Sequence, residues 1–191
     1  MKKIILIGSG GHAKSCIDII EKENKFKIVC LVDKFKKNSR LFNYPIVDEK
    51  IPLENLLKKA KNALIAVGQI KNADTRVKLF QKYKKLGFKF PVIISPNAIV
   101  SNYSEIDEGS IIMHQTIINA SSRIGSNCII NNKSLVEHDV VIGNHCHIST
   151  SVKVNGNTTI GNRVFIGSNS VIVNSKKIKS NTFIPAMSLI K

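Results

Sequence analysis

The sequence contains no tryptophan, and only three of its 191 residues are tyrosines. Acidic residues are also scarce, since 13 of them stand against 29 lysines and arginines, which gives a formal net charge of +16 at pH 7. A strong positive charge is typical of nucleic-acid-binding proteins. Here, however, the lysines are dispersed over the first ninety residues, and few aromatic side chains are present for base stacking. We therefore expect no nucleic-acid partner, and instead a solvated basic surface that attracts an anionic substrate.

Long apolar runs and a disulfide framework are absent as well. The apolar run near the N-terminus ends at Ile7, which is too short for a signal peptide, and no other stretch reaches the length of a membrane span. Of the four cysteines, Cys128 and Cys146 are separated by 18 residues and are expected to be buried thiols. Nothing in the sequence indicates an oxidising compartment. We expect a cytoplasmic protein with no membrane association.

What the sequence does contain is a six-residue repeat in its C-terminal half. Every sixth residue from Ile94 to Ile190 is Ile or Val, at seventeen positions without a skip. A helix repeats every 3.6 residues and a strand every 2, so neither alone explains this spacing. A coil of three short strands does explain it, and hexapeptide repeats are typical of a parallel β-helix.

A second column of small or β-branched residues precedes the first one by two positions. Lys176 is the one residue that interrupts it. Two inward columns, one bulky and one small, would fill a narrow triangular prism. Glycine follows the bulky residue at Gly125, Gly143, Gly161 and Gly167, where we expect a corner of the coil to need an unusual φ.

The N-terminal half alternates between predicted strands and helices. We expect strands at residues 2–8, 26–33, 63–68 and 90–94, helices at residues 9–23, 51–60 and 72–86, and a basic loop at residues 34–44. This alternation indicates a small α/β domain with a parallel sheet. We place a Rossmann-like domain at residues 1–93 and the β-helix domain at residues 94–191.

A glycine-rich segment joins the first strand to the first helix. It contains Gly8, Ser9, Gly10, Gly11 and His12. Glycine lets the backbone approach a phosphate closely, and the N-terminus of a helix favours negative charge. Asp33, at the end of the second strand, occupies the place where such folds contact a ribose or base. The alternative is a tight structural turn with Asp33 as a surface residue.

The triplet Glu137, His138 and Asp139 lies within the repeats. His138 is two residues past the inward Val136, so its side chain is expected to project from the coil. A neighbouring carboxylate raises the basicity of an imidazole and fixes its tautomer, which suits a general base. Gly156 and Ala120, one coil away on either side, are small and leave room for a groove. The alternative is a solvated histidine at a corner with incidental acidic neighbours.

His145 and His147 form an HxH motif, a spacing that permits metal binding. No further histidine lies one coil away from either of them, because residues 127, 129, 163 and 165 are Asn, Ile, Arg and Phe. We therefore expect no metal site, although a metal-dependent hydratase on the same prism stays open as an alternative.

Several segments together resemble one family, the bacterial sugar O-/N-acyltransferases of the sialic-acid O-acetyltransferase and nucleotide-4-amino-sugar N-acetyltransferase type. These segments are IILIGSGGHAKSCIDII, LVDKF, AVGQIKNADTR, SLVEHDVVIGNHCHISTSVKVNGNTTIG and VFIGSNSVIV. The resemblance covers nearly the whole chain. It implies a left-handed β-helix, acetyl-CoA as co-substrate, a nucleotide-sugar substrate, and a homotrimer with active sites between adjacent subunits.

The resemblance also implies roles for individual residues. His138 would be the general base, with Asp139 or Glu137 as the carboxylate that orients it. His147 and the backbone N–H of Gly156 would contact the reactive end of acetyl-CoA, and Asn131 would lie beside the acceptor sugar. The nucleotide sugar would be bound by a second set of residues, namely Gly8, Ser9, Gly10, Gly11, His12, Asp33, Lys34 and Gly68.

The last coils, including Ser168 and Ala186, would hold the rest of CoA. The segment FIPAMSLIK at residues 183–191 departs from the glycine-rich pattern of the family and its G-V-P-A-K ending. We therefore expect a weakened affinity for CoA. The catalytic centre around His138 is unaffected by this departure.

The implied activity is N-acetylation of a nucleotide-linked 4-amino-4,6-dideoxy sugar for bacterial surface glycan or glycoprotein biosynthesis. Two alternatives stay open, O-acetylation of a sialic-acid-type sugar and a non-catalytic trimeric scaffold that binds sugar. The first uses the same base, and the second rests on the unusual last coils.

Overall fold

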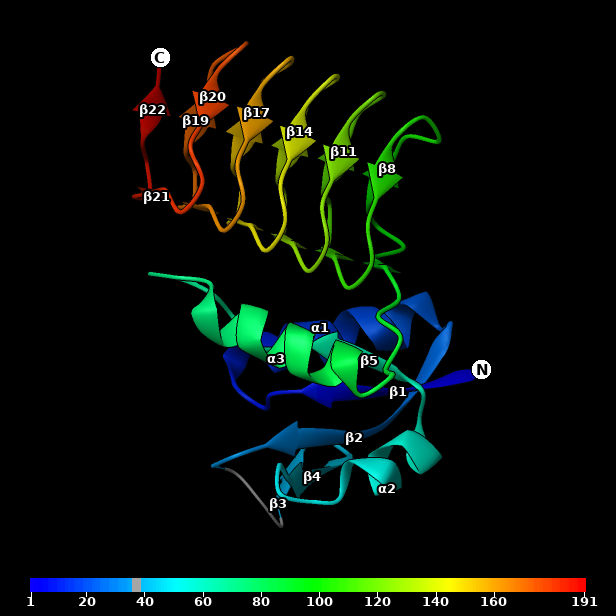
Figure 1. Cartoon of the computed structure of the whole chain (residues 1–191). Helices are drawn as coiled ribbons and strands as arrows, with labels where there is room; N and C mark the ends of the chain where they lie inside the picture. Colours follow the sequence, from blue (N-terminus) through cyan, green and yellow to red (C-terminus); the bar gives the residue numbers. More distant parts are fainter. Residues whose placement is uncertain (36–38) are drawn as a thin grey trace. The chain divides into compact units, whose positions relative to one another are not determined.

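The computed structural model describes residues 1–35 and 39–191 (Figure 1). The chain divides into two compact units. The N-terminal unit comprises residues 1–68 and 75–91, and the β-helix unit comprises residues 69–74 and 92–191. The short segment 69–74 thus packs with the β-helix unit, although it lies within the range that the sequence assigns to the first domain.

The N-terminal unit is built on a five-stranded sheet in the order β3-β4-β2-β1-β5. Its strands are β1 (Lys2–Ile7), β2 (Phe26–Asp33), β3 (Ser39–Leu41), β4 (Tyr44–Asp48) and β5 (Asn62–Ile65). All neighbours are parallel except β3 and β4. The interior strand β1 is buried from Ile4 to Ile7, which explains why its apolar run does not alternate. The predicted α/β fold with a parallel sheet is confirmed.

Three helices accompany this sheet: α1 (Gly11–Glu23), α2 (Leu53–Lys59) and α3 (Asp74–Lys85). Each was predicted to within a few residues. The buried face of α1 consists of Ala13, Cys16, Ile17, Ile19 and Ile20, as its periodicity predicts. The helix ends at Asn24, whose left-handed conformation (φ 56°) directs its N–H to the carbonyl of Ile20.

Two predictions for this unit were wrong. The segment 34–44 is not wholly a loop, because it includes β3 and the first residue of β4; its residues 36–38 lie outside the described part of the chain. Pro45 lacks an N–H, which weakens the sequence signal for β4. The predicted strand 90–94 shortens to β6 (Ile93–Ile94), which pairs with the β-helix, whereas Phe90 packs against Phe80 in the core of the N-terminal unit.

The β-helix unit is a left-handed parallel β-helix of two-residue strands arranged in three sheets. The first sheet contains β6 (Ile93–Ile94), β9 (Ile111–Ile112), β12 (Ile129–Ile130), β15 (His147–Ile148), β18 (Phe165–Ile166) and β21 (Phe183–Ile184). The second sheet contains β7 (Ile99–Val100), β10 (Ile117–Ile118), β13 (Leu135–Val136), β16 (Lys153–Val154), β19 (Val171–Ile172) and β22 (Leu189–Ile190). The third sheet contains β8 (Glu105–Ile106), β11 (Arg123–Ile124), β14 (Val141–Ile142), β17 (Thr159–Ile160) and β20 (Lys177–Ile178).

Both predicted inward columns fill the interior of this prism. The bulky column is buried from Ile112 to Ile172, and the small column is fully buried from Ser110 to Val164. The small polar members also bond the coils together. Ser110 Oγ, for example, donates to the carbonyl of Gly125 at 2.7 Å and accepts from the N–H of Cys128 at 2.9 Å. Each inward hydroxyl of this kind satisfies backbone groups that would otherwise be buried without a partner.

The prediction about the glycines was wrong in its physical reason. From residue 109 onward, the left-handed corner of each hexad falls three residues after the bulky column. Apart from Gly109, it is occupied by non-glycine residues such as Asn127, Asp139 and His145. Gly143 has no positive φ; instead, a Cβ there would lie 2.8 Å from the carbonyl carbon of Gly161 on the next coil. These glycines are therefore required for the close stacking of coils and not for a turn.

Candidate active site

His138 lies at the corner of the β-helix between β13 and β14. Its side chain is 61% exposed, as predicted for a residue outside both inward columns. The backbone around it is nonetheless fixed, because its carbonyl accepts from the N–H of Asn157 at 3.1 Å and the N–H of Asp139 donates to the carbonyl of Ala120 at 3.1 Å. An exposed imidazole is thus carried on a rigid corner.

Asp139 is the carboxylate bonded to this histidine. Its Oδ2 lies 2.8 Å from His138 Nδ1. Because a carboxylate accepts, Nδ1 carries the proton, and the lone pair of a neutral imidazole is then on Nε2. Asp139 occupies the left-handed corner position (φ 59°), a conformation that Asp adopts more readily than most residues. The turn of the coil itself brings the carboxylate beside the ring.

Glu137, the other candidate, has a different partner. Its Oε2 accepts from Nδ2 of Asn119, one coil away, at 2.9 Å. Its backbone carbonyl also accepts from the hydroxyl of Ser122 at 2.7 Å. The two carboxylates that flank His138 are therefore distinct, since Asp139 contacts the imidazole and Glu137 contacts the neighbouring coil.

Gly156 lies directly against the imidazole of His138, one coil further along. A Cβ at this position would be 2.8 Å from Cε1 and 2.9 Å from Nε2 of His138. Any side chain at position 156 would therefore clash with the imidazole of His138. Gly156 is buried, and its N–H donates to no other residue in the described part of the chain. A backbone donor is thus available beside the basic nitrogen.

His147 occupies a different place, on β15 of the first sheet, and is 8% exposed. Its Nδ1 donates to the carbonyl oxygen of Gln69 at 2.7 Å, so that nitrogen is protonated. Its Nε2 lies 3.2 Å from Nδ2 of Asn131. Asn131 Oδ1 accepts from the N–H of Asn132 at 2.8 Å, which fixes the amide so that Nδ2 donates to the imidazole. Both ring nitrogens are therefore engaged, and the ring is neutral.

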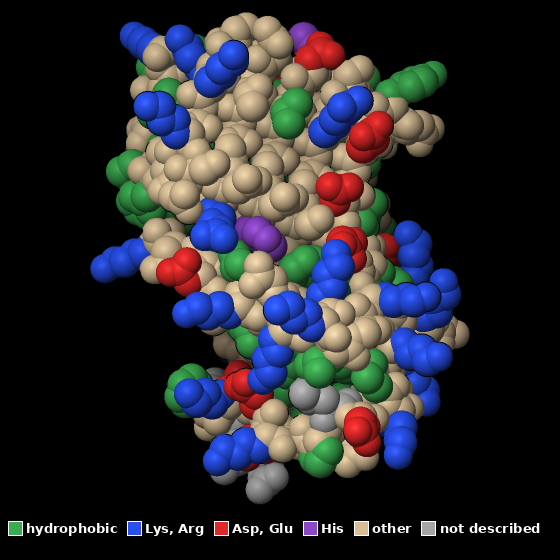
Figure 2. Space-filling view, in the orientation of Figure 1, with side chains coloured by type: hydrophobic (Ala, Val, Ile, Leu, Met, Phe, Trp, Pro, Cys, Tyr) green, Lys and Arg blue, Asp and Glu red, His purple; other side chains and the backbone are tan. Residues whose placement is uncertain are grey.

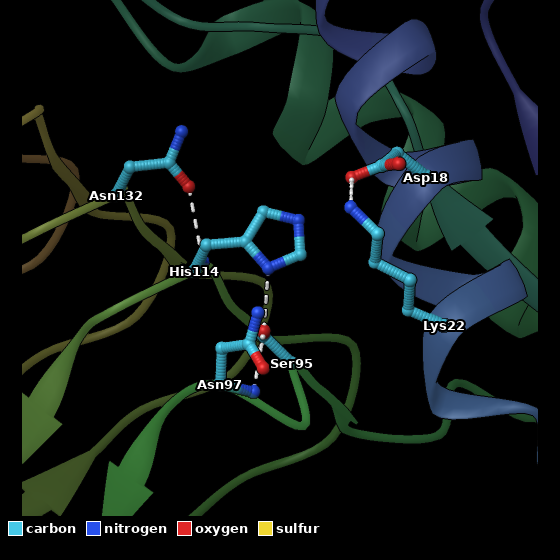
Figure 3. A network of polar contacts seen from close by, with 6 residues as sticks. All are labelled: Asp18, Lys22, Ser95, Asn97, His114 and Asn132. Atoms are coloured by element: carbon cyan, nitrogen blue, oxygen red, sulfur yellow. Dashed lines mark hydrogen bonds and ion pairs between the residues drawn. The ribbon is translucent and has the colours of Figure 1, made fainter.

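A related network of hydrogen bonds surrounds His114, which follows β9 at a corner of the first sheet. Ser95 Oγ lies 2.6 Å from Nδ1 of His114, and Asn132 Oδ1 accepts from the N–H of His114 at 3.0 Å. Figure 3 shows these residues around the ring. Ser95 Oγ also accepts from the N–H of Asn97 at 3.1 Å. This network was not predicted, and its only sequence signal is the changeover Ser95-Pro96-Asn97.

Ser168 and Ala186, the residues assigned to the CoA end, stack one above the other at the corner that follows the first sheet. Ser168 Oγ lies 2.9 Å from the hydroxyl of Ser149, and Ala186 is exposed. His138 and Gly156 lie at the corner that follows the second sheet. A single chain therefore does not bring Ser168 and Ala186 together with His138.

The glycine-rich segment of the N-terminal unit lies at the carboxyl ends of β1 and β5. Gly8 needs to be glycine twice over, because its φ is 107° and a Cβ would lie 2.6 Å from Cγ2 of Val67. A Cβ added to Gly10 or Gly11 would meet no atom within 4 Å, and both residues are exposed at the start of α1. The first turn of α1 carries no acidic residue. The loop thus offers open space in front of the N-terminus of a helix, a favourable place for a phosphate.

Asp33 is tied to this loop. Its Oδ2 accepts from the N–H of Ser9 at 2.8 Å and from the hydroxyl of Ser9 at 2.7 Å, while its Oδ1 accepts from the N–H of Phe35 at 2.8 Å. Gly68 lies next to His12, since a Cβ on Gly68 would be 3.6 Å from His12 Cβ. Lys34 is exposed, with its Nζ 5.5 Å from the centre of the Phe35 ring. The structure brings the predicted substrate residues of this unit to one edge of its sheet.

Sequence reasoning missed Arg76, which is 1% exposed. Its Nη1 donates to the carbonyls of Ile65 at 3.2 Å and Val67 at 2.6 Å, just past the end of β5. Val67 is the residue that contacts Gly8. Arg76 therefore holds the chain segment against which the glycine-rich loop packs, and an arginine in the first turn of a predicted helix gave no signal of this role.

The remaining predictions concern metals, charge and membranes. Within residues 1–35 and 39–191, no three His, Cys, Asp or Glu side chains are grouped to hold a metal, and His145 Nδ1 instead lies 3.0 Å from the amide of Asn127. On the face drawn in Figure 2, lysines and arginines are spread out with acidic side chains among them. None of the described helices is long and apolar enough to span a membrane.

Two family matches cover different parts of the chain. Residues 3–83 match the family described as the PglD N-terminal domain, and residues 139–174 match the bacterial transferase hexapeptide family of six repeats. The first match spans the glycine-rich loop and Asp33. The second spans Asp139, His147 and Gly156.

Several solved structures with the same fold are acetyltransferases. One is a histidine-to-asparagine variant of perosamine N-acetyltransferase from Caulobacter crescentus, in complex with CoA and GDP-perosamine. It is 26% identical to this chain with a TM-score of 0.93, and the match covers 100% of this chain and 89% of the variant's chain. The acetyltransferase domain of PglB from Neisseria gonorrhoeae is 28% identical with a TM-score of 0.91, over 92% of its chain and all of this one. The same domain in complex with acetyl coenzyme A is 27% identical with a TM-score of 0.89, over 92% of its chain and 99% of this one.

Proposed function

This chain belongs to the bacterial sugar acyltransferases of the hexapeptide-repeat class, and we propose that it transfers the acetyl group of acetyl-CoA to the amino group of a nucleotide-linked 4-amino-4,6-dideoxy sugar. The product would serve bacterial surface glycan or glycoprotein biosynthesis. The observation that carries this proposal is the corner at His138, where an imidazole with its Nδ1 bonded to Asp139 lies beneath a glycine with an available N–H. Neighbours that hold CoA and GDP-perosamine support both substrates.

His138 acts as the general base in this proposal. Nε2 takes a proton from the sugar amine as the amine nitrogen attacks the thioester carbon of acetyl-CoA. A carbon–nitrogen bond forms, the carbon–sulfur bond breaks, and CoA leaves as the thiol after gaining a proton. Asp139 keeps the proton on Nδ1 and stabilises the imidazolium that forms, because the two groups are 2.8 Å apart. The N–H of Gly156 would donate to the thioester oxygen as negative charge develops there.

The two substrates would bind to the residues predicted from the sequence. The loop from Gly8 to His12, with Asp33, Lys34 and Gly68, would bind the nucleotide sugar in the N-terminal unit. Asn131 would contact the acceptor sugar. The acetyl-CoA site would be formed by Gly156, Ser168 and Ala186, with His147 at its border.

We also propose a homotrimer with active sites between subunits. The outward residues of the second β-helix sheet are mostly apolar: Ile99, Ile117, Leu135, Val171 and Leu189, with Lys153 between them. Those of the third sheet are polar or charged apart from one valine: Glu105, Arg123, Val141, Thr159 and Lys177. His138 lies at the corner where the apolar second sheet ends. A subunit that covers this sheet would border His138 and can supply the other corner, with Ser168 and Ala186, to the same site.

We also propose a compartment for the reaction. All four cysteines are free and buried, which suits a reducing compartment. We place the reaction in the cytoplasm, where free thiols persist.

The test is acetyl transfer by the purified protein from acetyl-CoA to UDP-, GDP- and dTDP-linked 4-amino-4,6-dideoxy sugars, followed by mass spectrometry. We expect one nucleotide sugar to gain a single acetyl group on nitrogen. A protein that acetylates a sialic-acid hydroxyl but none of these amino sugars would contradict the N-acetyl proposal. A protein that binds sugar without binding acetyl-CoA in calorimetry would contradict the enzymatic proposal as a whole.

A further inference from the structure

Gln69 carries a buried carboxamide whose two polar atoms have no hydrogen-bonding partner within residues 1–35 and 39–191. The residue is 3% exposed, and neither its Oε1 nor its Nε2 bonds to any residue in the described part of the chain. Leaving a polar group buried without a partner is unfavourable, and nearly all buried polar side-chain atoms in proteins are bonded. A carboxamide with both ends unsatisfied therefore indicates that something absent from the isolated chain bonds to it.

The backbone of Gln69 is fixed by His147. Its carbonyl accepts from Nδ1 of His147 at 2.7 Å, while Nε2 of the same ring accepts from Nδ2 of Asn131. Residues 66–73 contain no helix or strand, so this bond ties an otherwise irregular segment to β15 of the β-helix. The neutral imidazole thus joins two residues, Gln69 through its main chain and Asn131 through its side chain.

Asn131 also has bonding capacity left over. Its Oδ1 is used by the N–H of Asn132 and one hydrogen of Nδ2 is used by His147, so the second hydrogen of Nδ2 has no acceptor in the described chain. Two carboxamides therefore flank one ring, and each retains groups that can bond to a ligand. The neighbours of Gln69 in the chain, Gly68 and Ile70, are exposed, so the segment is within reach of solvent and ligands.

We infer that the side chain of Gln69 binds the acyl acceptor through the hydroxyl groups of its sugar, and that His147 is the positioning residue that holds Gln69 and Asn131 in place. A carboxamide offers one acceptor and two donors, and a sugar hydroxyl is at once a donor and an acceptor, so each can satisfy the other. The inference rests on the proposed function, since it assigns a further contact to the same acceptor.

The deciding variant is Gln69→Leu, which keeps the size of the side chain and removes both unsatisfied groups. We expect its melting temperature in the absence of ligand to equal or exceed that of the wild type, because a buried apolar group replaces one that lacks its bonds. We expect its KM for GDP-perosamine, or for whichever nucleotide amino sugar the wild type acetylates, to rise about 10-fold or more. Its Kd for acetyl-CoA should stay unchanged. Ile70→Ala, at the exposed neighbouring position, is the matched control and should keep the wild-type KM.

Acceptor analogues identify the bond. The wild type is assayed with two acceptor analogues, one lacking the C2 hydroxyl and one lacking the C3 hydroxyl. For one of the two analogues, the KM of the wild type should rise as much as Gln69→Leu raises the KM for the intact acceptor. That analogue should show no further loss with the Leu variant, because both changes delete the same bond.

A Leu variant that melts well below the wild type, or that keeps the wild-type KM for the acceptor, would overturn the inference, as would a loss confined to acetyl-CoA. These outcomes differ from a failure of the proposed function, in which the wild type itself would acetylate no nucleotide amino sugar.

Discussion

At the scale of single residues, the proposed reaction centre depends on an imidazole that is exposed and yet held from two directions. Asp139 bonds to its Nδ1, and Gly156 of the next coil leaves just enough room for its ring. Neither contact buries the side chain. The residue can therefore be replaced at little cost to stability, which makes kinetic tests straightforward to interpret.

We expect His138→Ala to lower kcat by about 100-fold or more, the usual contribution of a general base. The Kd for acetyl-CoA, measured by calorimetry, should change little, and the melting temperature should stay close to that of the wild type because the side chain is 61% exposed. His145→Asn is the matched control. It replaces another corner histidine with a residue that occupies the equivalent position at Asn127 and Asn181, and it should keep full activity. An unchanged rate in His138→Ala would exclude the mechanism.

The two flanking carboxylates should differ in their effect. Asp139→Asn preserves the left-handed corner but removes the charge that stabilises an imidazolium, so we expect kcat to fall about 10-fold or more. Glu137→Gln retains an acceptor for Asn119 and should lower kcat much less. Steady-state kinetics on both variants would decide, and a larger loss in Glu137→Gln would reverse the assignment.

At the scale of elements, two positions of each hexad differ in the residues that they tolerate. The left-handed corner accepts Asn, Ser, Asp, His, Lys and Arg, whereas the position after the bulky column is glycine where the next coil comes closest. The first position tolerates a side chain because it projects outward. The second does not, because a Cβ would meet backbone atoms.

We therefore expect Gly143→Ala to destabilise the protein by about 1–3 kcal/mol, the usual cost of overpacking. For a chain of this length that corresponds to a fall in melting temperature of about 2–4 °C per kcal/mol. Asn169→Gly, at a left-handed corner, should change stability by less than about 1 kcal/mol. Thermal unfolding of the two variants checks this, and equal shifts would show that the glycine position is not restricted by the neighbouring coil.

The four buried thiols, two in the N-terminal unit and two in the prism, should behave as structural groups. Burial raises the pKa of Cys16 to about 12, and the pKa of Cys146 is raised by its hydrogen bond with Cys128 and by burial. Because the thiolate is the reactive form, we expect none of the four cysteines to react with a thiol reagent at neutral pH in the folded protein, and all four to react in denaturant. Cys146→Ser should remain folded, since serine occupies the same inward column at Ser110 and Ser134. Rapid labelling of the native protein would contradict this description of the interior.

At the scale of the whole molecule, the outer faces of the prism differ from one another. The apolar outer face of the second sheet lies next to His138, whereas the third sheet presents charges. The proposed trimer explains this difference, because subunits that associate through the second sheet would bury apolar side chains and leave the charged face in water.

We expect Leu135→Glu, on the outer face of the second sheet, to dissociate the trimer and abolish activity with the same substrates. Light scattering coupled to size exclusion would then give the mass of one 21.1 kDa chain. Val141→Glu, on the third sheet, is the matched control and should remain a trimer with wild-type activity. A wild-type protein that is monomeric and active would refute the proposed assembly.

Much of this architecture could be predicted from the sequence because it is periodic. Every sixth residue from Ile94 to Ile190 is Ile or Val, a spacing that a three-sided coil accommodates. That spacing places Val136 inside the coil and His138 outside it without any knowledge of contacts. The helix α1 and the loop from Gly8 to Gly11 were predictable for a similar reason, since an apolar strand, glycines and an amphipathic pattern follow one another directly.

Contacts between residues distant in sequence were decided by the tertiary structure. Three-dimensional packing determined that Glu137 bonds to Asn119 of the neighbouring coil and that Gly143 serves the stacking of coils. It also determined that Arg76 holds Val67 against Gly8, and that Gln69 is buried beside His147. The physical reason is the range of the signals. Periodicity and local propensity specify which face of an element is buried, whereas a hydrogen bond between residues 69 and 147 depends on how separate segments meet, and no pattern within either segment encodes it.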